Sequence, residues 1–404
     1  MKVGIIGGIS SYLSYLVWNN YNSNQVELYS LNNELQNEIV KNCPSLTSYR
    51  PPAFYCGFLH TVIPTISRPK EKHISFFEKL GDTGISVDFV DKGQSINSNQ
   101  PLLLIIPGLT GKVQNGQAYV NSLITQAHQY GFNNIGIYTY RMLSKDADFH
   151  FVPPFQDYGI DFQGADKEYF RDDVVTGQTT RIDLPADLHY TLKYIKDKYK
   201  FKQILAIGCS YGGVQLGNYL GRFQEHSYID AGVTVCSPHN ITDCESNIST
   251  IMDFTMTYIL RRGLNINRHL FDDQKNYPQQ WKPSISKAMN SLFVHQFDRY
   301  YTSQIYGYKS EVEYYKHFSS SDRFSHIKIP MLCIASKDDY AVNIKALSLD
   351  KLLSNKQTIV CLAQCGGHIG FLEGLNADST WFPKPALEFL RHFSKEQKIE
   401  FKAI

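Results

Sequence analysis

Ile204-Leu-Ala-Ile-Gly208-Cys-Ser210-Tyr211-Gly212-Gly is the stretch of sequence that decides the fold. Four apolar residues run into a G-x-S-x-G box, and residues 214–220 continue with leucines four apart, as in a helix. A strand, a sharp turn and a helix in this order push the hydroxyl of Ser210 out of the turn. A helix that begins at Tyr211 also points backbone N–H groups toward Ser210. We predict that Ser210 is a nucleophile; an ordinary glycine-rich turn is the alternative.

Two boxes further along the chain hold the partners that a nucleophilic serine needs. Asp338 and Asp339 follow the apolar residues 331–335, and His368 follows the apolar residues 358–362 after a pair of glycines. An imidazole can accept the hydroxyl proton near neutral pH, and a buried carboxylate fixes its tautomer. The order serine, acid, histidine matches one known arrangement of a catalytic triad. An Asp-x-x-Val count favours Asp339 as the acid, whereas the distance from the strand end leaves Asp338 open.

An oxyanion hole is expected upstream of the serine. Residues 101–106 form a strongly apolar run that ends in Pro107-Gly-Leu109-Thr-Gly. Glycines in such a loop let backbone N–H groups approach a developing alkoxide. We predict that the N–H groups of Leu109 and Tyr211 stabilise that charge.

With these boxes in place, the chain resembles the abhydrolase-domain subgroup of the α/β-hydrolase superfamily, which has YheT-like bacterial relatives. The similarity covers residues 40–393 and includes the following segments: Pro107-Gly-Leu-Thr-Gly111, Gly208-Cys-Ser-Tyr-Gly-Gly213, Ala335-Ser-Lys-Asp-Asp339, Gly366-Gly-His-Ile-Gly-Phe-Leu-Glu-Gly374, Cys43-Pro, Tyr49-Arg-Pro-Pro52, Leu59-His-Thr61, Phe297-Asp298 and Tyr314-Tyr315. The resemblance implies a serine hydrolase for carboxylic esters, often lipid-like, in proteins that are commonly anchored to membranes. It implies Ser210 as nucleophile, Asp339 as acid and His368 as base.

The chain departs from the family pattern at three places. Thr139-Tyr-Arg-Met142 lacks the glycine of the usual Asn-x-Arg-Gly turn, and Tyr340 replaces a proline that is common after the acidic pair. The loop of residues 143–173 is lengthened and rich in aromatic residues. These changes affect the predicted entrance and substrate preference rather than the triad.

Length and composition fit one large catalytic domain. The 404 residues include 43% hydrophobic residues, and 40 basic against 38 acidic side chains give no nucleic-acid footprint. Strand-like and helical patterns alternate, which predicts an α/β fold with a mostly parallel sheet and helices on both faces. Residues 85–90 alternate apolar and polar, as in a half-buried strand. We assign residues 21–404 to the hydrolase domain, with a helical cap inserted at about residues 239–327.

The N-terminal residues 3–18 are an apolar run slightly shorter than the ~20 residues that span a bilayer. We favour an uncleaved membrane anchor within residues 1–20 over a buried helix, and hence a membrane-associated intracellular protein. The eight cysteines are scattered, as free thiols are in a reducing compartment. Cys361 and Cys365 with His368 could suggest zinc, but no second ligand pair is spaced suitably, so we expect no metal or other cofactor.

The predicted function is hydrolysis of a carboxylic, lipid-like ester through an acyl-enzyme on Ser210. Two alternatives stay open. The first is an acyltransferase that uses the same acyl-enzyme. The second is a catalytically silent subunit of a membrane assembly. The expected binding partner is a small ester or lipid.

Overall fold

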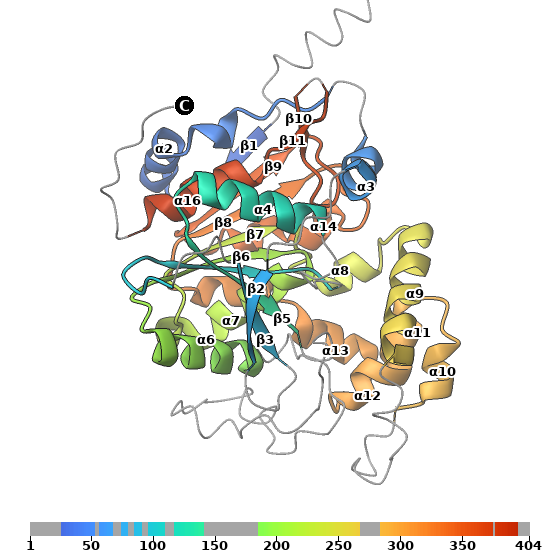
Figure 1. Cartoon of the computed structure of the whole chain (residues 1–404). Helices are drawn as coiled ribbons and strands as arrows, with labels where there is room; N and C mark the ends of the chain where they lie inside the picture. The colour runs from blue at the N-terminus through green and yellow to red at the C-terminus, as the bar shows by residue number, and fades with distance from the viewer. Residues whose placement is uncertain are drawn as a thin grey trace, which may run out of the picture.

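The structure is a computed structural model that describes residues 26–52, 56–67, 74–79, 85–90, 96–109, 117–140, 185–266, 283–374 and 376–394. Its centre is a nine-stranded sheet in the order β1-β9-β8-β7-β6-β4-β5-β3-β2 (Figure 1). The strands are β1 (Val26–Tyr29), β2 (Ile74–Lys79), β3 (Ser86–Val90), β4 (Leu102–Ile106), β5 (Asn134–Thr139), β6 (Ile204–Cys209), β7 (Ala231–Val235), β8 (Met331–Ser336) and β9 (Thr358–Ala363). A separate hairpin pairs β10 (Leu372–Glu373) with β11 (Ser379–Thr380).

Six neighbouring strands of the sheet, β9-β8-β7-β6-β4-β5, pair in parallel. Antiparallel strands flank them at both edges. Every residue of β4 and β6 is buried, as expected for strands covered by helices on both faces. The predicted mostly parallel α/β sheet is therefore confirmed. In the register of β4 and β6, Ile106 lies opposite Gly208, so both strands end at the same edge, next to Ser210.

Helices cover both faces of the sheet. On one face lie α2 (Asn33–Asn42), α4 (Ala118–Gln129) and α16 (Pro383–His392), and on the other lie α6 (Ala186–Tyr199) and α7 (Tyr211–Phe223) (Figure 1). In β4, β6, β8 and β9, alternate residues contribute to the two hydrophobic clusters beneath these helices. A further helix of the N-terminal part is α3 (Gly57–Ser67), which lies near the C-terminal ends of the strands.

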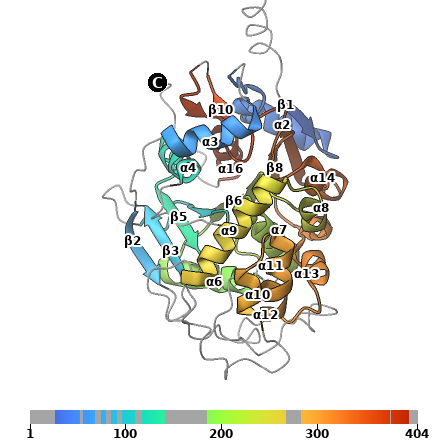
Figure 2. The same cartoon turned by 90° about the vertical axis from the view of Figure 1, so that its right-hand side faces the viewer.

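Residues 239–266 and 283–327 contain helices and no strand. These helices are α8 (Ile241–Glu245), α9 (Thr250–Ile266), α10 (Ile285–Met289), α11 (Val294–Phe297), a π-helix (Asp298–Thr302), α12 (Ser303–Ile305), α13 (Glu311–Phe318) and a 3-10 helix (Ser321–His326). They gather on one side of the molecule, with α9 crossing in front (Figure 2), and share a hydrophobic cluster that also includes Val214 of α7. Two short helices, α14 (Ile344–Leu347) and α15 (Leu349–Leu352), follow β8.

The sequence-based expectations were wrong in two respects. Strands β1 and β2 were not expected, because β1 has only four residues and both are edge strands. The strand predicted to be half-buried, β3, is buried at all five positions. Its polar residues find internal partners, since Asp88 accepts hydrogen bonds from the hydroxyls of Ser86 and Thr139 at 2.9 and 3.0 Å.

Two predicted features lie outside the described residues: the N-terminal residues 3–18 and the loop of residues 143–173. Among the helices that the structure describes, none combines the length and the apolar character needed to cross a membrane.

Candidate active site

Ser210 lies at the turn between β6 and α7 in a strained backbone conformation, with φ 51° and ψ −119°. Such a conformation costs about 1–3 kcal/mol and persists only where neighbours enforce it. Here the Ser210 N–H donates to the Val235 carbonyl at 2.8 Å, and the Ser210 carbonyl accepts from Gly213 at 3.0 Å. The turn therefore presents the serine hydroxyl in a fixed direction.

The two glycines of the box are needed for close packing. Neither has a positive φ. A Cβ on Gly212 would collide with the carbonyls of Ile106 and Pro107 at the end of β4. A Cβ on Gly208 would lie 2.6 Å from the Gly212 carbonyl oxygen. The box thus lets the start of α7 pack directly against the β4 loop.

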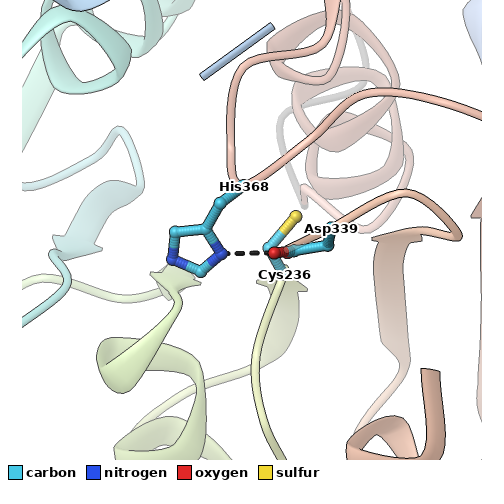
Figure 3. A group of neighbouring side chains, drawn as sticks. All are labelled: Cys236, Asp339 and His368. Carbon is cyan, nitrogen blue, oxygen red and sulfur yellow. Dashed lines mark hydrogen bonds and ion pairs between the residues drawn. The ribbon is translucent and has the colours of Figure 1, made fainter. Parts of the chain in front are cut away.

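His368 joins the serine to an aspartate. Its Nε2 lies 3.0 Å from Ser210 Oγ, and its Nδ1 lies 2.9 Å from Asp339 Oδ2. The loops that carry the three side chains follow β6, β8 and β9, and Figure 3 shows the imidazole pointing at Asp339. The Asp339 side chain is 2% exposed and that of His368 is 17% exposed. The structure therefore brings together the three predicted residues and leaves the imidazole partly accessible.

The two adjacent aspartates have different surroundings. Asp339 Oδ1 accepts hydrogen bonds from the backbone of Ala341 and Val342 at 2.8 and 2.9 Å, which leaves Oδ2 for His368. Asp338 points elsewhere. Its Oδ1 accepts from the Ser336 hydroxyl at 2.5 Å and from the N–H groups of residues 366 and 367 at 2.9 Å each. Of the two, only Asp339 is placed to orient the imidazole.

Leu109 and Tyr211, the predicted oxyanion donors, lie on the two segments that the glycines bring together. A Cβ on Gly108 would be 3.5 Å from Ser210 Cβ, so the β4 loop passes beside the serine. The Gly108 N–H donates to the Tyr119 hydroxyl at 2.9 Å. The next N–H along this loop belongs to Leu109, and the first N–H of α7 belongs to Tyr211.

Cys236 was not predicted to take part in the site. It follows β7 with φ 49°, and its Sγ accepts from the Ile369 N–H at 3.4 Å. One ligand atom each of Cys236, Asp339 and His368 lie within 4.8 Å of one another (Figure 3). Burial, and to a smaller extent the negative charge of the nearby Asp339, hold the pKa of the thiol well above its ordinary range. Both nitrogens of the imidazole already bond inside the triad, so His368 has no nitrogen left to ligate a metal while the triad is intact.

Two other cysteines near the triad, Cys365 and Cys209, are also unreactive. Burial raises the pKa of Cys365 to about 12, and burial raises the pKa of Cys209, beside the serine, even further. A thiol reacts through its thiolate, so neither is activated.

A row of aromatic rings, Tyr140, Tyr211 and Phe318, runs from the residue after the serine toward helix α13. The ring of Tyr211 is 5.4 Å from that of Phe318 and 5.8 Å from that of Tyr140. The Tyr140 hydroxyl donates to the Pro107 carbonyl at 2.5 Å. The described helical residues 283–327 therefore contact Tyr211, next to the serine, through Phe318 of α13.

Comparisons with known proteins show which proteins this chain is similar to. A family profile described as alpha/beta hydrolase fold covers residues 146–375, which include all three triad positions. Phospholipase ABHD3 of Homo sapiens is 26% identical over 370 residues, 87% of this chain and 80% of the relative. Monoacylglycerol lipase of Saccharomyces cerevisiae is 27% identical over 219 residues, 53% of this chain and 48% of the relative. Medium-chain fatty acid ethyl ester synthase/esterase 2 of the same yeast is 25% identical over 228 residues, 52% and 50% of the two chains.

Proposed function

This chain belongs to the α/β-hydrolase fold family, and we propose that it cleaves lipid-like carboxylic esters through an acyl-enzyme on Ser210. The enzyme is a carboxylic ester hydrolase, as are its relatives named lipase and esterase. The observation that supports the mechanism is the continuous line of hydrogen bonds from Ser210 Oγ through both nitrogens of His368 to Asp339 Oδ2.

In the first half of the proposed reaction, Ser210 Oγ attacks the ester carbonyl while His368 Nε2 takes the hydroxyl proton. Asp339 keeps the other proton on Nδ1 and stabilises the imidazolium that forms. The tetrahedral intermediate collapses when its C–O bond breaks, and the departing alkoxide receives the proton from Nε2. The alcohol leaves, and the acyl group remains on Ser210.

In the second half, a water molecule replaces the alcohol. His368 Nε2 accepts a proton from the water, whose oxygen attacks the acyl carbonyl. Collapse of this second intermediate returns the proton to Ser210 Oγ and releases the carboxylic acid. In both halves the N–H groups of Leu109 and Tyr211 stabilise the oxyanion, an effect worth about 3–4 kcal/mol per donor in comparable sites.

Lipid-like esters are the proposed substrate class for two reasons. The relatives are named phospholipase, monoacylglycerol lipase and fatty acid ethyl ester synthase/esterase. In addition, the ring of Tyr211, which directly follows the serine and is partly exposed, packs against the buried Phe318. Apolar surface next to a nucleophile favours binding of an acyl chain.

The acyl-enzyme can be tested directly. A fluorophosphonate probe should label the wild-type protein, and Ser210→Ala should abolish both labelling and hydrolysis of lipid esters. Ser354→Ala, which removes an exposed hydroxyl just after α15, is the matched control and should label normally. Labelling that persists in Ser210→Ala would refute the nucleophile. Absence of labelling in the folded wild type would favour the silent-subunit alternative.

Acyl transfer remains the second candidate, because one relative is named both synthase and esterase. The same acyl-enzyme would then be attacked by an alcohol rather than by water. Hydrolysis in the presence of rising ethanol or monoacylglycerol separates the two reactions. Transfer predicts that ester product replaces free fatty acid at low alcohol concentration, whereas hydrolysis predicts that fatty acid remains the main product.

We also propose that the protein associates with membranes. The apolar residues 3–18 support this from the sequence. Three large side chains on one face of α9 support it from the structure, since Ile251 is 80% exposed, Phe254 44% and Tyr258 63%. Exposed apolar and aromatic side chains at these helical spacings suit a lipid interface. Release of all the protein by a carbonate wash would argue against an anchor.

A further inference from the structure

The first turn of α3, residues 57–61, lies between the two loops that carry the acid and the histidine. The acid loop is residues 337–343 and the histidine loop is residues 364–371. The backbone N–H of His368 donates to Thr61 Oγ1 at 2.8 Å, and the Thr61 hydroxyl donates to the Gly57 carbonyl at 3.0 Å. Thr61 is therefore bonded to the backbone of the histidine itself, 307 residues away in sequence.

Three backbone segments meet here without side chains between them. A Cβ on Gly57 would collide with the Asp338 carbonyl oxygen, and a Cβ on Gly367 would collide with the Gly57 carbonyl oxygen. A Cβ on Gly370 would likewise collide with the His60 carbonyl oxygen. Contacts this close let α3 restrain both loops, because none of the three segments can shift without the others.

His60 fixes the far end of the histidine loop. Its side chain is fully buried, and its Nδ1 accepts from the Leu372 N–H at 3.0 Å. Burial lowers the pKa of His60 to about 4, so the imidazole is neutral at physiological pH and can accept that bond. The histidine loop is thus attached to α3 on both sides of His368.

The acid loop reaches α3 through Tyr340, the residue that departs from the family pattern. The rings of Tyr340 and Phe58 are 5.8 Å apart. Burial raises the pKa of the Tyr340 hydroxyl. The first turn of α3 is therefore in contact with both loops.

We propose that Thr61 is a positioning residue, whose hydroxyl holds the backbone of His368 so that the imidazole spans Asp339 and Ser210. This inference rests on the proposed role of His368 as the base. A displacement of about 1 Å in a reacting group can cost about 10²-fold in rate, and the bond to Thr61 acts on the backbone of the same residue that carries the imidazole. Such a residue affects the chemical step more than binding of the ester.

The test compares Thr61→Val, which keeps the shape but removes the hydroxyl, with Thr61→Ser, which keeps the hydroxyl. Thr61→Val should lower kcat about 10- to 100-fold with KM changed less than about twofold, and Thr61→Ser should stay within about threefold of wild type. Ile66→Ala is the control, because Ile66 lies on the same helix and is 78% exposed. Thermal unfolding identifies variants that are folded, and Thr61→Ala replaces Thr61→Val if the latter does not fold.

The outcome also separates this inference from the proposed function. If His368→Ala is inactive while folded Thr61→Val keeps a kcat within about twofold of wild type, the positioning role is refuted and the mechanism stands. If His368→Ala is as active as wild type, the mechanism itself fails. A loss in Thr61→Val that Thr61→Ser does not restore would indicate a packing effect and would also overturn the role of the hydroxyl.

Discussion

Replacing each of the adjacent aspartates by asparagine should have very different effects on catalysis: a large loss at position 339 and a small one at position 338. In Asp339→Asn, the amide oxygen is needed at the Oδ1 position, where two backbone N–H groups donate at 2.8 and 2.9 Å. The amide NH₂ then faces His368 Nδ1 and can only donate to it. Nδ1 must accept, so the imidazole proton moves to Nε2, which faces Ser210 Oγ at 3.0 Å. That tautomer cannot take the hydroxyl proton.

The alternative orientation of the amide does not avoid this problem. A flipped amide in this variant would place its NH₂ against the two backbone donors and lose both hydrogen bonds, at about 1–3 kcal/mol for each unsatisfied group. We therefore expect kcat to fall about 10³- to 10⁴-fold, comparable to the loss of the corresponding carboxylate in other triads. This is about 4–5 kcal/mol in the barrier.

Asp338→Asn is the matched control. The groups that bond Asp338 Oδ1 are all donors, so one amide oxygen can accept from all three. Only the added strength of charged hydrogen bonds is lost, on the order of 2 kcal/mol in total. The thermal midpoint should fall, while kcat should stay within about tenfold of wild type.

The assay is steady-state hydrolysis of a short-chain p-nitrophenyl ester, with fluorophosphonate labelling rate as a second readout. Thermal unfolding shows whether each variant is folded. If Asp338→Asn loses about 10³-fold and Asp339→Asn retains about a tenth or more of the activity, the assignment of the acid is wrong. If both lose little, the hydrogen bond to His368 does not support catalysis.

Three further predictions concern stability. Gly212→Ala should lower the melting temperature and reduce labelling, because the new Cβ meets two carbonyls, whereas Gly263→Ala in α9 has open space and should stabilise the helix by up to about 1 kcal/mol. The protein should lose stability as the pH falls below about 6.5, because burial keeps His60, His189 and His239 neutral in the folded state while they protonate in the unfolded chain. Thermal unfolding from about pH 8 to about pH 4 measures this loss. Their pKa values are lowered to about 4 for His60 and about 3 for His189 and His239. Burial raises the pKa of Asp298 from 3.8 to about 6. Ionisation of Asp298 therefore destabilises the folded state progressively as the pH rises from 3.8 to about 6, and fully above that pH. Asp298→Asn should therefore raise the melting temperature at alkaline pH and give a smaller gain at acidic pH.

The sequence predicted the central strands well because burial on both faces leaves a continuous apolar signal. The apolar runs of residues 101–106, 331–335 and 358–362 each lie within one residue of the bounds of the strand that forms there. Strand β2 was missed because its pairing with β3 shifts register between Ile74 and Phe76, so its apolar residues do not alternate regularly. Strand β1 was missed because four residues at a sheet edge give little apolar signal and pair with residues far away. Val26 pairs with Ala363, for example, near the opposite end of the chain.

The site was predictable to the extent that it is local. The elbow at Ser210 and the glycines before His368 are short motifs whose backbone geometry is encoded nearby. The choice between Asp338 and Asp339 was not local, because it depends on which oxygen meets the N–H groups of another loop. Cys236 gave no signal for the same reason, since only the fold brings its sulfur to Ile369.

Tyr340, which replaces the proline of the family pattern, leaves the acid in place. Asp339 is held by the N–H groups of Ala341 and Val342, neither of which depends on the side chain at position 340. A tyrosine there can therefore turn its ring toward Phe58 without moving the carboxylate. The replacement of a proline by Tyr340 adds a contact between the acid loop and α3, and α3 in turn bonds the backbone of His368. Tyr340 thus connects the acid loop to the same helix that bonds the backbone of the base, a connection that neither motif reveals alone.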